Sequence, residues 1–139
     1  MTNRAAHLNT STRPGVLVWL AVTTIMSTIN AVVWHIGDRP DAVESYRVLL
    51  ETARAEMWGV AFAAIAALCL VGLFTERHIP IRAAMALHFF VCGSFAWSLL
   101  FSVAIGRTSI LVLAGFTAWT SWALTTAFLL AQPFTDIEA

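Results

Sequence analysis

Hydroxyl, amide and imidazole side chains interrupt an apolar stretch near the N-terminus, and these are residue types that could carry chemistry. Thr23, Ser27 and Asn30 recur at spacings of three and four residues, so they share one face of a helix. His35 follows at the end of the same stretch. In an enzyme such groups serve acid–base chemistry, whereas inside lipid they hydrogen-bond between helices. The environment of this stretch therefore decides between the two interpretations.

Four long stretches of the chain contain no Asp, Glu, Lys or Arg. The 139 residues are 59% hydrophobic and 12% charged, against about 25% charged in an ordinary soluble domain. A helix crosses the hydrocarbon layer of a membrane with about 17 to 25 residues, and all four stretches fit. The sequence therefore predicts an all-α, integral membrane four-helix bundle that forms a single domain over residues 1–139. The predicted spans are 16–36, 57–74, 83–105 and 108–131, after a polar N-terminal tail at 1–15.

The segment between the first two spans is the only sizeable part expected outside the membrane. Over about 41–56, apolar side chains recur every three or four residues, opposite a face on which acidic and basic side chains alternate. This pattern predicts a short amphipathic helix at the membrane interface. Its apolar face packs either on its own bundle or on a partner. The residues of this candidate docking face are Val43, Tyr46, Leu50, Ala53 and Met57.

Uncharged polar residues within the spans predict contacts between helices. In lipid such side chains turn towards other helices, where each hydrogen bond contributes about 0.6 to 2 kcal/mol. We therefore expect one set of helix–helix polar contacts, drawn from spans one, three and four. Its members are Thr23, Ser27, Asn30, Ser98, Thr117 and Ser121. The alternative is that these residues line a water-filled path when several copies assemble.

Two further patterns predict how the helices pack. Gly59, Ala63 and Ala67 are small residues at a spacing of four, which lets helix backbones approach closely. The tight connection at 106–108 predicts that spans three and four form an antiparallel hairpin, which would bring Trp97 towards Trp119. We therefore expect an aromatic cluster between these two spans.

The sequence lacks the motifs of several functional classes, which argues against those classes. No carboxylate or arginine lies within a predicted span, whereas ion-coupled transporters usually carry one there. Cys69 and Cys92 lack metal-ligand spacing. His35 and His88 are expected near opposite membrane surfaces, too far apart for a shared haem. No phosphate-binding loop or basic patch indicates a nucleotide or nucleic acid. We therefore expect no enzymatic activity, no cofactor, no metal site and no nucleic-acid partner.

The sequence favours a non-enzymatic protein that acts through helix association. The first hypothesis is an accessory or assembly subunit of a larger membrane complex, whose partners are the lipid bilayer and other membrane subunits or copies of itself. A self-oligomerising, holin-like pore is the alternative, because the size and span number are compatible with phage holins, although no motif supports it. A small uncoupled channel or carrier is the third hypothesis. With four spans both termini share one side, which we expect to be the cytoplasmic side of the cell membrane.

Overall fold

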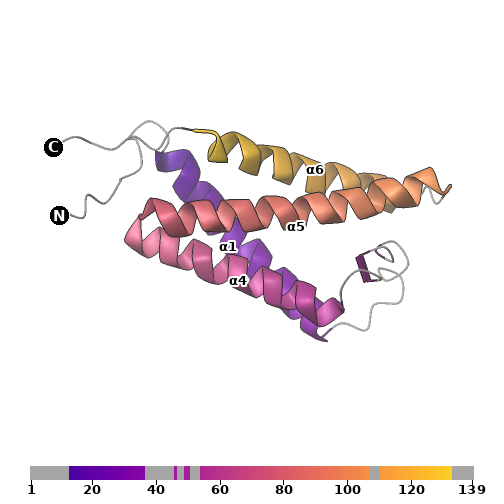
Figure 1. Cartoon of the computed structure of the whole chain (residues 1–139), viewed down its shortest axis with the longest axis horizontal. Coiled ribbons are helices and arrows are strands. Elements are labelled where there is room, and N and C mark those ends of the chain that lie inside the picture. The colour runs from indigo at the N-terminus through magenta and orange to yellow at the C-terminus, as the bar shows by residue number, and fades with distance from the viewer. Residues whose placement is uncertain (1–12, 37–45, 47–48, 51–53, 107–109, 133–139) are drawn as a thin grey trace.

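The computed structural model of the chain describes residues 13–36, 46, 49–50, 54–106 and 110–132. Four helices account for nearly all of them: α1 (Arg13–Ile36), α4 (Ala55–Thr75), α5 (His78–Ala104) and α6 (Ile110–Leu130) (Figure 1). Each helix is long and apolar enough to cross a membrane. The prediction of an all-α protein with four membrane-spanning helices is confirmed.

Three of the helices begin a few residues before the charge-free stretches that predicted them, and α6 begins at Ile110, two residues after its predicted start. α1 starts at Arg13, α4 at Ala55 and α5 at His78, rather than at 16, 57 and 83. A charged side chain in the first turn does not end a membrane helix, because its long stem reaches the surface while the backbone stays helical. The interfacial helix predicted at 41–56 lies largely outside the described residues.

α5 is the central helix of the bundle. α4 and α6 both pack along it, and α1 packs along α4. In Figure 1, α5 and α6 run side by side in opposite directions, as the tight connection between them predicts, and α1 crosses behind α5 at an angle. The start of α1 lies near the end of α6, and the two helices diverge from there.

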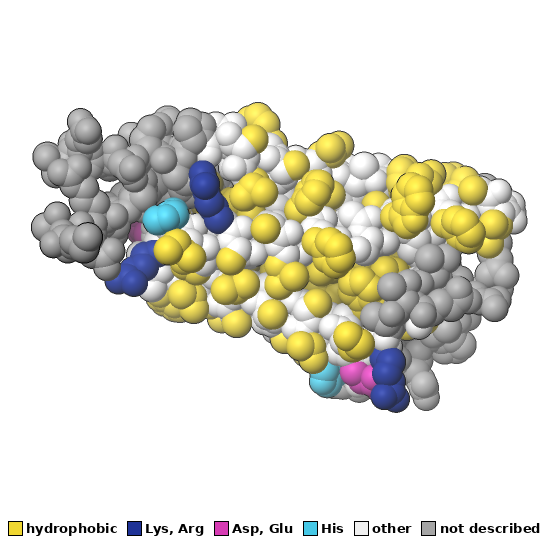
Figure 2. All heavy atoms as spheres, in the orientation of Figure 1, with side chains coloured by type: hydrophobic (Ala, Val, Ile, Leu, Met, Phe, Trp, Pro, Cys, Tyr) yellow, Lys and Arg dark blue, Asp and Glu magenta, His cyan; other side chains and the backbone are white. Residues whose placement is uncertain are grey.

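The core lies where α1, α4 and α5 meet. Its largest fully buried side chains include Leu20, Phe62, Ile65, Met85 and Phe95. Apolar side chains also cover the outside, and Figure 2 shows them as a band between two ends at which the charged side chains gather. Because lipid is as apolar as these side chains, close packing rather than escape from water holds the helices together.

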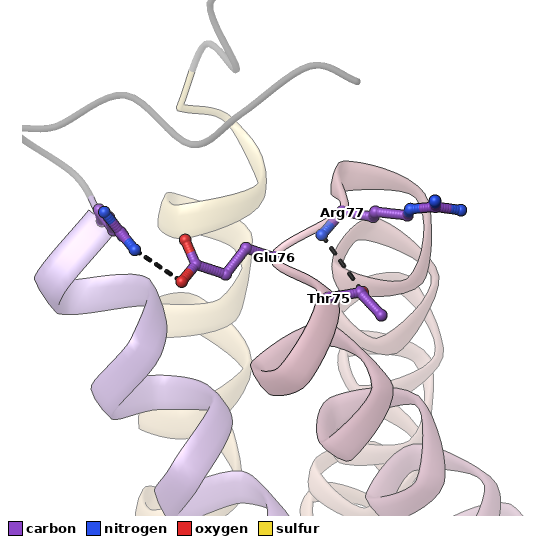
Figure 3. A network of polar contacts seen from close by, with 4 residues as sticks. Thr75, Glu76 and Arg77 are labelled. Atoms are coloured by element: carbon purple, nitrogen blue, oxygen red, sulfur yellow. Dashed lines mark hydrogen bonds and ion pairs between the residues drawn. The ribbon is translucent and has the colours of Figure 1, made fainter. Parts of the chain in front are cut away.

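A two-residue turn, Glu76 and Arg77, joins α4 to α5. Glu76 adopts the left-handed conformation (φ 50°, ψ 21°), and its N–H donates to Gly72 O at 2.8 Å, which closes the end of α4. The Glu76 carboxylate meets the guanidinium of Arg13 at the start of α1, with Nη2 and Oε1 2.6 Å apart (Figure 3). Thr75 Oγ1 accepts a hydrogen bond from Arg77 N–H at 3.4 Å. These contacts tie α1, α4 and α5 together at one end.

Two glycines of α4 allow its neighbours to approach closely. A Cβ on Gly72 would lie 2.9 Å from Ile81 Cγ1, and one on Gly59 would lie 2.5 Å from the imidazole at the end of α1. The predicted series of small residues is otherwise wrong, because Ala63 and Ala67 are exposed. Residues at a constant spacing of four rotate gradually around a helix, because one turn takes about 3.6 residues. The buried face of α4 instead combines spacings of three and four. That face carries Trp58, Gly59, Phe62, Ile65, Ala66, Cys69 and Gly72.

Candidate functional site

A buried polar cluster joins three helices inside the bundle. Thr126 Oγ1 on α6 accepts a hydrogen bond from Trp19 Nε1 on α1 at 3.2 Å. The same oxygen lies 3.0 Å from His88 Nδ1 on α5. Thr126 is 0% and His88 3% exposed, so both groups need hydrogen-bond partners within the protein. One hydroxyl therefore connects α1, α5 and α6.

The geometry is consistent with a continuous chain of donors and acceptors. Thr126 Oγ1 donates to Trp122 O at 2.9 Å, and Cys92 Sγ lies 3.3 Å from His88 Nε2. The indole of Trp19 can only donate. With the hydroxyl proton directed to Trp122 O, His88 donates to Thr126 through Nδ1, which leaves Nε2 to accept from the thiol. Every donor in the cluster then has an acceptor.

Aromatic rings surround this cluster and continue along α5. Trp19 and Trp122 meet the His88 ring edge-on, with centroid distances of 5.3 and 6.0 Å. Further along, Phe95 lies at the centre of a second group of rings, with centroids 4.8 to 5.6 Å away. The rings of this group are those of Trp34, Tyr46, Trp58, Phe62 and Trp119.

The aromatic cluster expected between α5 and α6 is therefore centred on a different residue. The sequence predicted Trp97 as its α5 member, but Trp97 is 65% exposed and Phe95 contacts Trp119 instead. Two residues along a helix amount to a rotation of roughly 200°, so these side chains lie on opposite faces of α5. The antiparallel hairpin was predicted correctly, but the face of α5 that points into the bundle was not.

Tyr46 attaches the segment between α1 and α4 to this second group of rings. Its hydroxyl accepts a hydrogen bond from Trp119 Nε1 at 3.2 Å, and Leu49 O accepts one from Trp58 Nε1 at 3.4 Å. Tyr46 and Leu49 thus pack on their own bundle, which is one of the two alternatives that the sequence left open. For the rest of the predicted docking face, Leu50 is half-buried, Met57 is exposed, and Val43 and Ala53 lie outside the described residues.

Three of the six predicted helix–helix contacts are buried, namely Thr23, Ser27 and Ser98. Thr23 Oγ1 and Ser98 Oγ have no hydrogen-bond partner in the described part of the chain. A buried hydroxyl without a partner costs about 1 to 3 kcal/mol. The three side chains lie inside the bundle, and their hydrogen bonds to other helices stay a prediction.

The other three predicted contacts lie nearer the outside. Asn30 is half-buried and donates from Nδ2 to Met26 O of its own helix at 2.8 Å. Thr117 and Ser121 are exposed, and Thr117 Oγ1 donates to Leu113 O at 2.9 Å, again within its own helix. Contacts from these residues to another helix also stay a prediction.

Sequence reasoning missed Thr126 and Trp19 as polar contacts. Thr125, the neighbour of Thr126, continues the pattern Thr117 and Ser121 at a spacing of four, which drew attention to the exposed face of α6. A usable signal did exist. Trp19 lies in the second turn of α1 and Thr126 one turn before the end of α6, so helices of alternating direction place them at similar depth.

A cavity of about 280 Å³ lies beside His88. Buried Ser27, Phe62 and His88 form its floor, and exposed Met26 and Ala118 form its rim. The remaining lining residues are Asn30, Trp119 and Trp122. The rim belongs to α1 and α6, which make little direct contact with each other. The cavity therefore opens between these two helices, on the side that would face lipid.

Comparisons with known proteins identify no relative of this chain, so its function is inferred from the structure. No family model, curated protein or solved structure matches the chain. Among the described residues, no group of three or more His, Cys, Asp or Glu side chains could hold a metal ion. Four apolar helices of membrane-spanning length identify the chain as a multi-pass membrane protein.

Proposed function

We propose that this protein is a non-enzymatic subunit that acts by helix association within a larger membrane complex. The observation that carries the proposal is a stripe of hydroxyls on α6, Thr117, Ser121 and Thr125, which recur every four residues and are all exposed. α6 is also the least covered helix, since 17% of its span is buried against 50% for α5. Polar side chains of membrane helices usually face protein rather than lipid. A helix of a second protein is therefore the expected cover of the α6 stripe.

The hydroxyls of the α6 stripe keep the capacity to bind a partner. Thr117 and Thr125 donate to the carbonyl oxygens of Leu113 and Ser121, at 2.9 Å in each case. These bonds satisfy the donors, while each hydroxyl oxygen can still accept a hydrogen bond. A partner helix with Ser, Thr, Asn or Gln side chains at matching spacing would supply the donors.

Photo-crosslinking from the α6 stripe tests this proposal. A photoreactive amino acid is introduced at Ser121, and at Val60 on the exposed side of α4 as a lipid-facing control. We expect one discrete adduct with a different protein from Ser121 in native membranes, and none from Val60. A ladder of adducts of the chain with itself would instead support the self-assembling, holin-like pore. Absence of any protein adduct would contradict helix association.

Co-purification in mild detergent gives a second, independent measurement. The double variant Thr117→Leu/Ser121→Leu should lose the partner protein while its thermal melting stays unchanged. Ser94→Leu on α5 is the matched control, because Ser94 Oγ also donates only to a carbonyl of its own helix, Phe90 O, at 2.9 Å. This control should retain the partner at fixed stoichiometry. Loss of the partner from both variants would show that the α6 stripe is not the docking surface.

We further propose that both termini face the cytoplasm. The start of α1 and the end of α6 lie at one end of the bundle, where Trp19 bonds to Thr126. The sequence-based preference for the cytoplasmic side rests on Arg47 and Arg54, which are assigned to the opposite side and have carboxylate neighbours in the sequence. A reporter that is active only in the cytoplasm should work when it is fused to either terminus. Activity confined to the opposite compartment would reverse the assignment.

A further inference from the structure

We propose that the cavity between α1 and α6 binds an uncharged planar ring that carries carbonyl oxygens, the chemistry of a membrane-dissolved quinone headgroup. The cavity is formed within one chain, so this inference does not depend on the partner protein proposed above. Four properties of the cavity support it: its volume, its aromatic walls, its polar groups and the position of its opening.

The volume of the cavity suits one substituted ring. It measures about 280 Å³, whereas a protein cavity of about 150 Å³ accepts benzene. Sites for larger organic ligands cover roughly 300 to 1,000 Å³. A six-membered ring with several substituents therefore fits, while a helix does not.

Aromatic side chains form much of the wall. Phe62, Trp119 and Trp122 all line the cavity, and the rings of Phe62 and Trp119 lie 6.1 Å apart at 35° to each other. Such rings stack on the flat faces of conjugated ligands. Indoles are electron-rich, and a ring that carries carbonyl groups is electron-poor, so the two attract each other. A planar conjugated ligand fits this wall better than a flexible saturated chain.

Polar groups reach the cavity from two helices. Ser27 is 2% exposed and lines the cavity from α1. Asn30, one turn further along α1, uses Nδ2 once, for Met26 O, and so retains a second N–H. His88 lines the cavity from α5. The Ser27 hydroxyl and the remaining N–H of Asn30 are donors on α1 from which carbonyl oxygens of a ring could accept, while the His88 imidazole, whose Nδ1 bonds to Thr126, adds a polar side chain to the wall.

The opening and the absence of charge exclude other ligand classes. Among the described residues, none that lines the cavity is Asp, Glu, Lys or Arg, and an unpaired ionic ligand inside a membrane is costly. Because the rim is formed by α1 and α6, a ligand enters from the lipid phase and must dissolve there. An acyl chain would dissolve in lipid but would offer no acceptor to the second N–H of Asn30. An uncharged ring with carbonyl oxygens meets all of these conditions.

Tryptophan fluorescence of the purified full-length chain in lipid nanodiscs tests the proposal. The probe is a decyl-substituted benzoquinone, whose ring quenches nearby indoles, and Trp119 and Trp122 line the cavity. We expect quenching that saturates at one probe per chain and is not displaced by decylbenzene, which has the same tail without carbonyl oxygens. Quenching that rises linearly with the probe, or equal competition by decylbenzene, would overturn the proposal.

Variants at the rim localise the site. Ala118→Phe places a ring in the opening and should weaken binding at least tenfold. Ala114→Phe is the matched control, because Ala114 is exposed one turn earlier on α6 and does not line the cavity; its affinity should be unchanged. Asn30→Leu should weaken binding on the order of tenfold through the lost hydrogen bond. Unchanged affinity in both Ala118→Phe and Asn30→Leu, with melting curves that show folded protein, would also overturn the proposal.

Discussion

His88 Nδ1 and Thr126 Oγ1 lie 3.0 Å apart and join α5 to α6 inside the bundle. The same oxygen accepts the indole N–H of Trp19. Thr126→Val preserves the shape of the side chain but removes this oxygen, which leaves two buried donors without a partner. We expect a loss of about 1 to 3 kcal/mol in the free energy of unfolding. The midpoint of unfolding in a denaturing-detergent titration measures it.

Thr125 provides the matched control for this experiment. Its side chain is exposed, and its hydroxyl donates only to Ser121 O of the same helix. Thr125→Val should therefore change the unfolding free energy by less than about 0.5 kcal/mol. Equal effects of the two substitutions would show that the link between His88 and Thr126 does not stabilise the bundle.

Phe95 holds the second group of rings together. Because five aromatic side chains contact it, Phe95→Ala opens a cavity that they cannot all fill. We expect a loss of about 3 to 5 kcal/mol, measured by the same titration. Phe90→Ala on the exposed side of α5 should cost under about 1 kcal/mol. A similar loss of stability in the two variants would contradict the central position of Phe95 in the group of rings.

The spans could be predicted from the sequence because solvation in lipid is a local property of the chain. A stretch without charge and of hydrocarbon length is stable as a helix wherever its neighbours lie. This explains why the stretch predicted at 57–74 corresponds closely to α4, Ala55–Thr75. The ends shifted by a few residues because helical backbone continues into the interface, where charged side chains reach water.

The rotation of each helix could not be predicted in the same way. In a soluble protein polar residues mark the outside of a helix, but here apolar side chains cover both the core and the surface that faces lipid. Phe95 and Trp97 are therefore equivalent by composition, as are Thr125 and Thr126. Only the packing of the four helices decides which member of each pair is buried. The cavity beside His88 has the same origin, because it needs side chains from all four helices.

Gly72 allows α4 to approach α5 closely. A Cβ at this position would lie 2.9 Å from Ile81 Cγ1 in the core, whereas a Cβ on Gly93 would meet nothing within 4 Å. Gly72→Leu should destabilise the bundle by about 1 to 3 kcal/mol or more through overpacking. Gly93→Leu should leave the melting temperature in detergent unchanged or slightly raised, because leucine favours a helix over glycine. Equal stability of the two variants would contradict the close contact at Gly72.

The ion pair between Arg13 and Glu76 fastens the start of α1 to the turn between α4 and α5. Glu76→Gln removes the charge and keeps a side chain of the same size. Because both partners are partly exposed, we expect a loss of up to about 1 kcal/mol at low ionic strength. At 1 M salt, where the screening length falls to about 3 Å, the loss should shrink. Glu56→Gln is the control, since Glu56 meets only the highly exposed Arg54, at 3.6 Å. An effect of Glu76→Gln that is independent of salt would show that charge is not its cause.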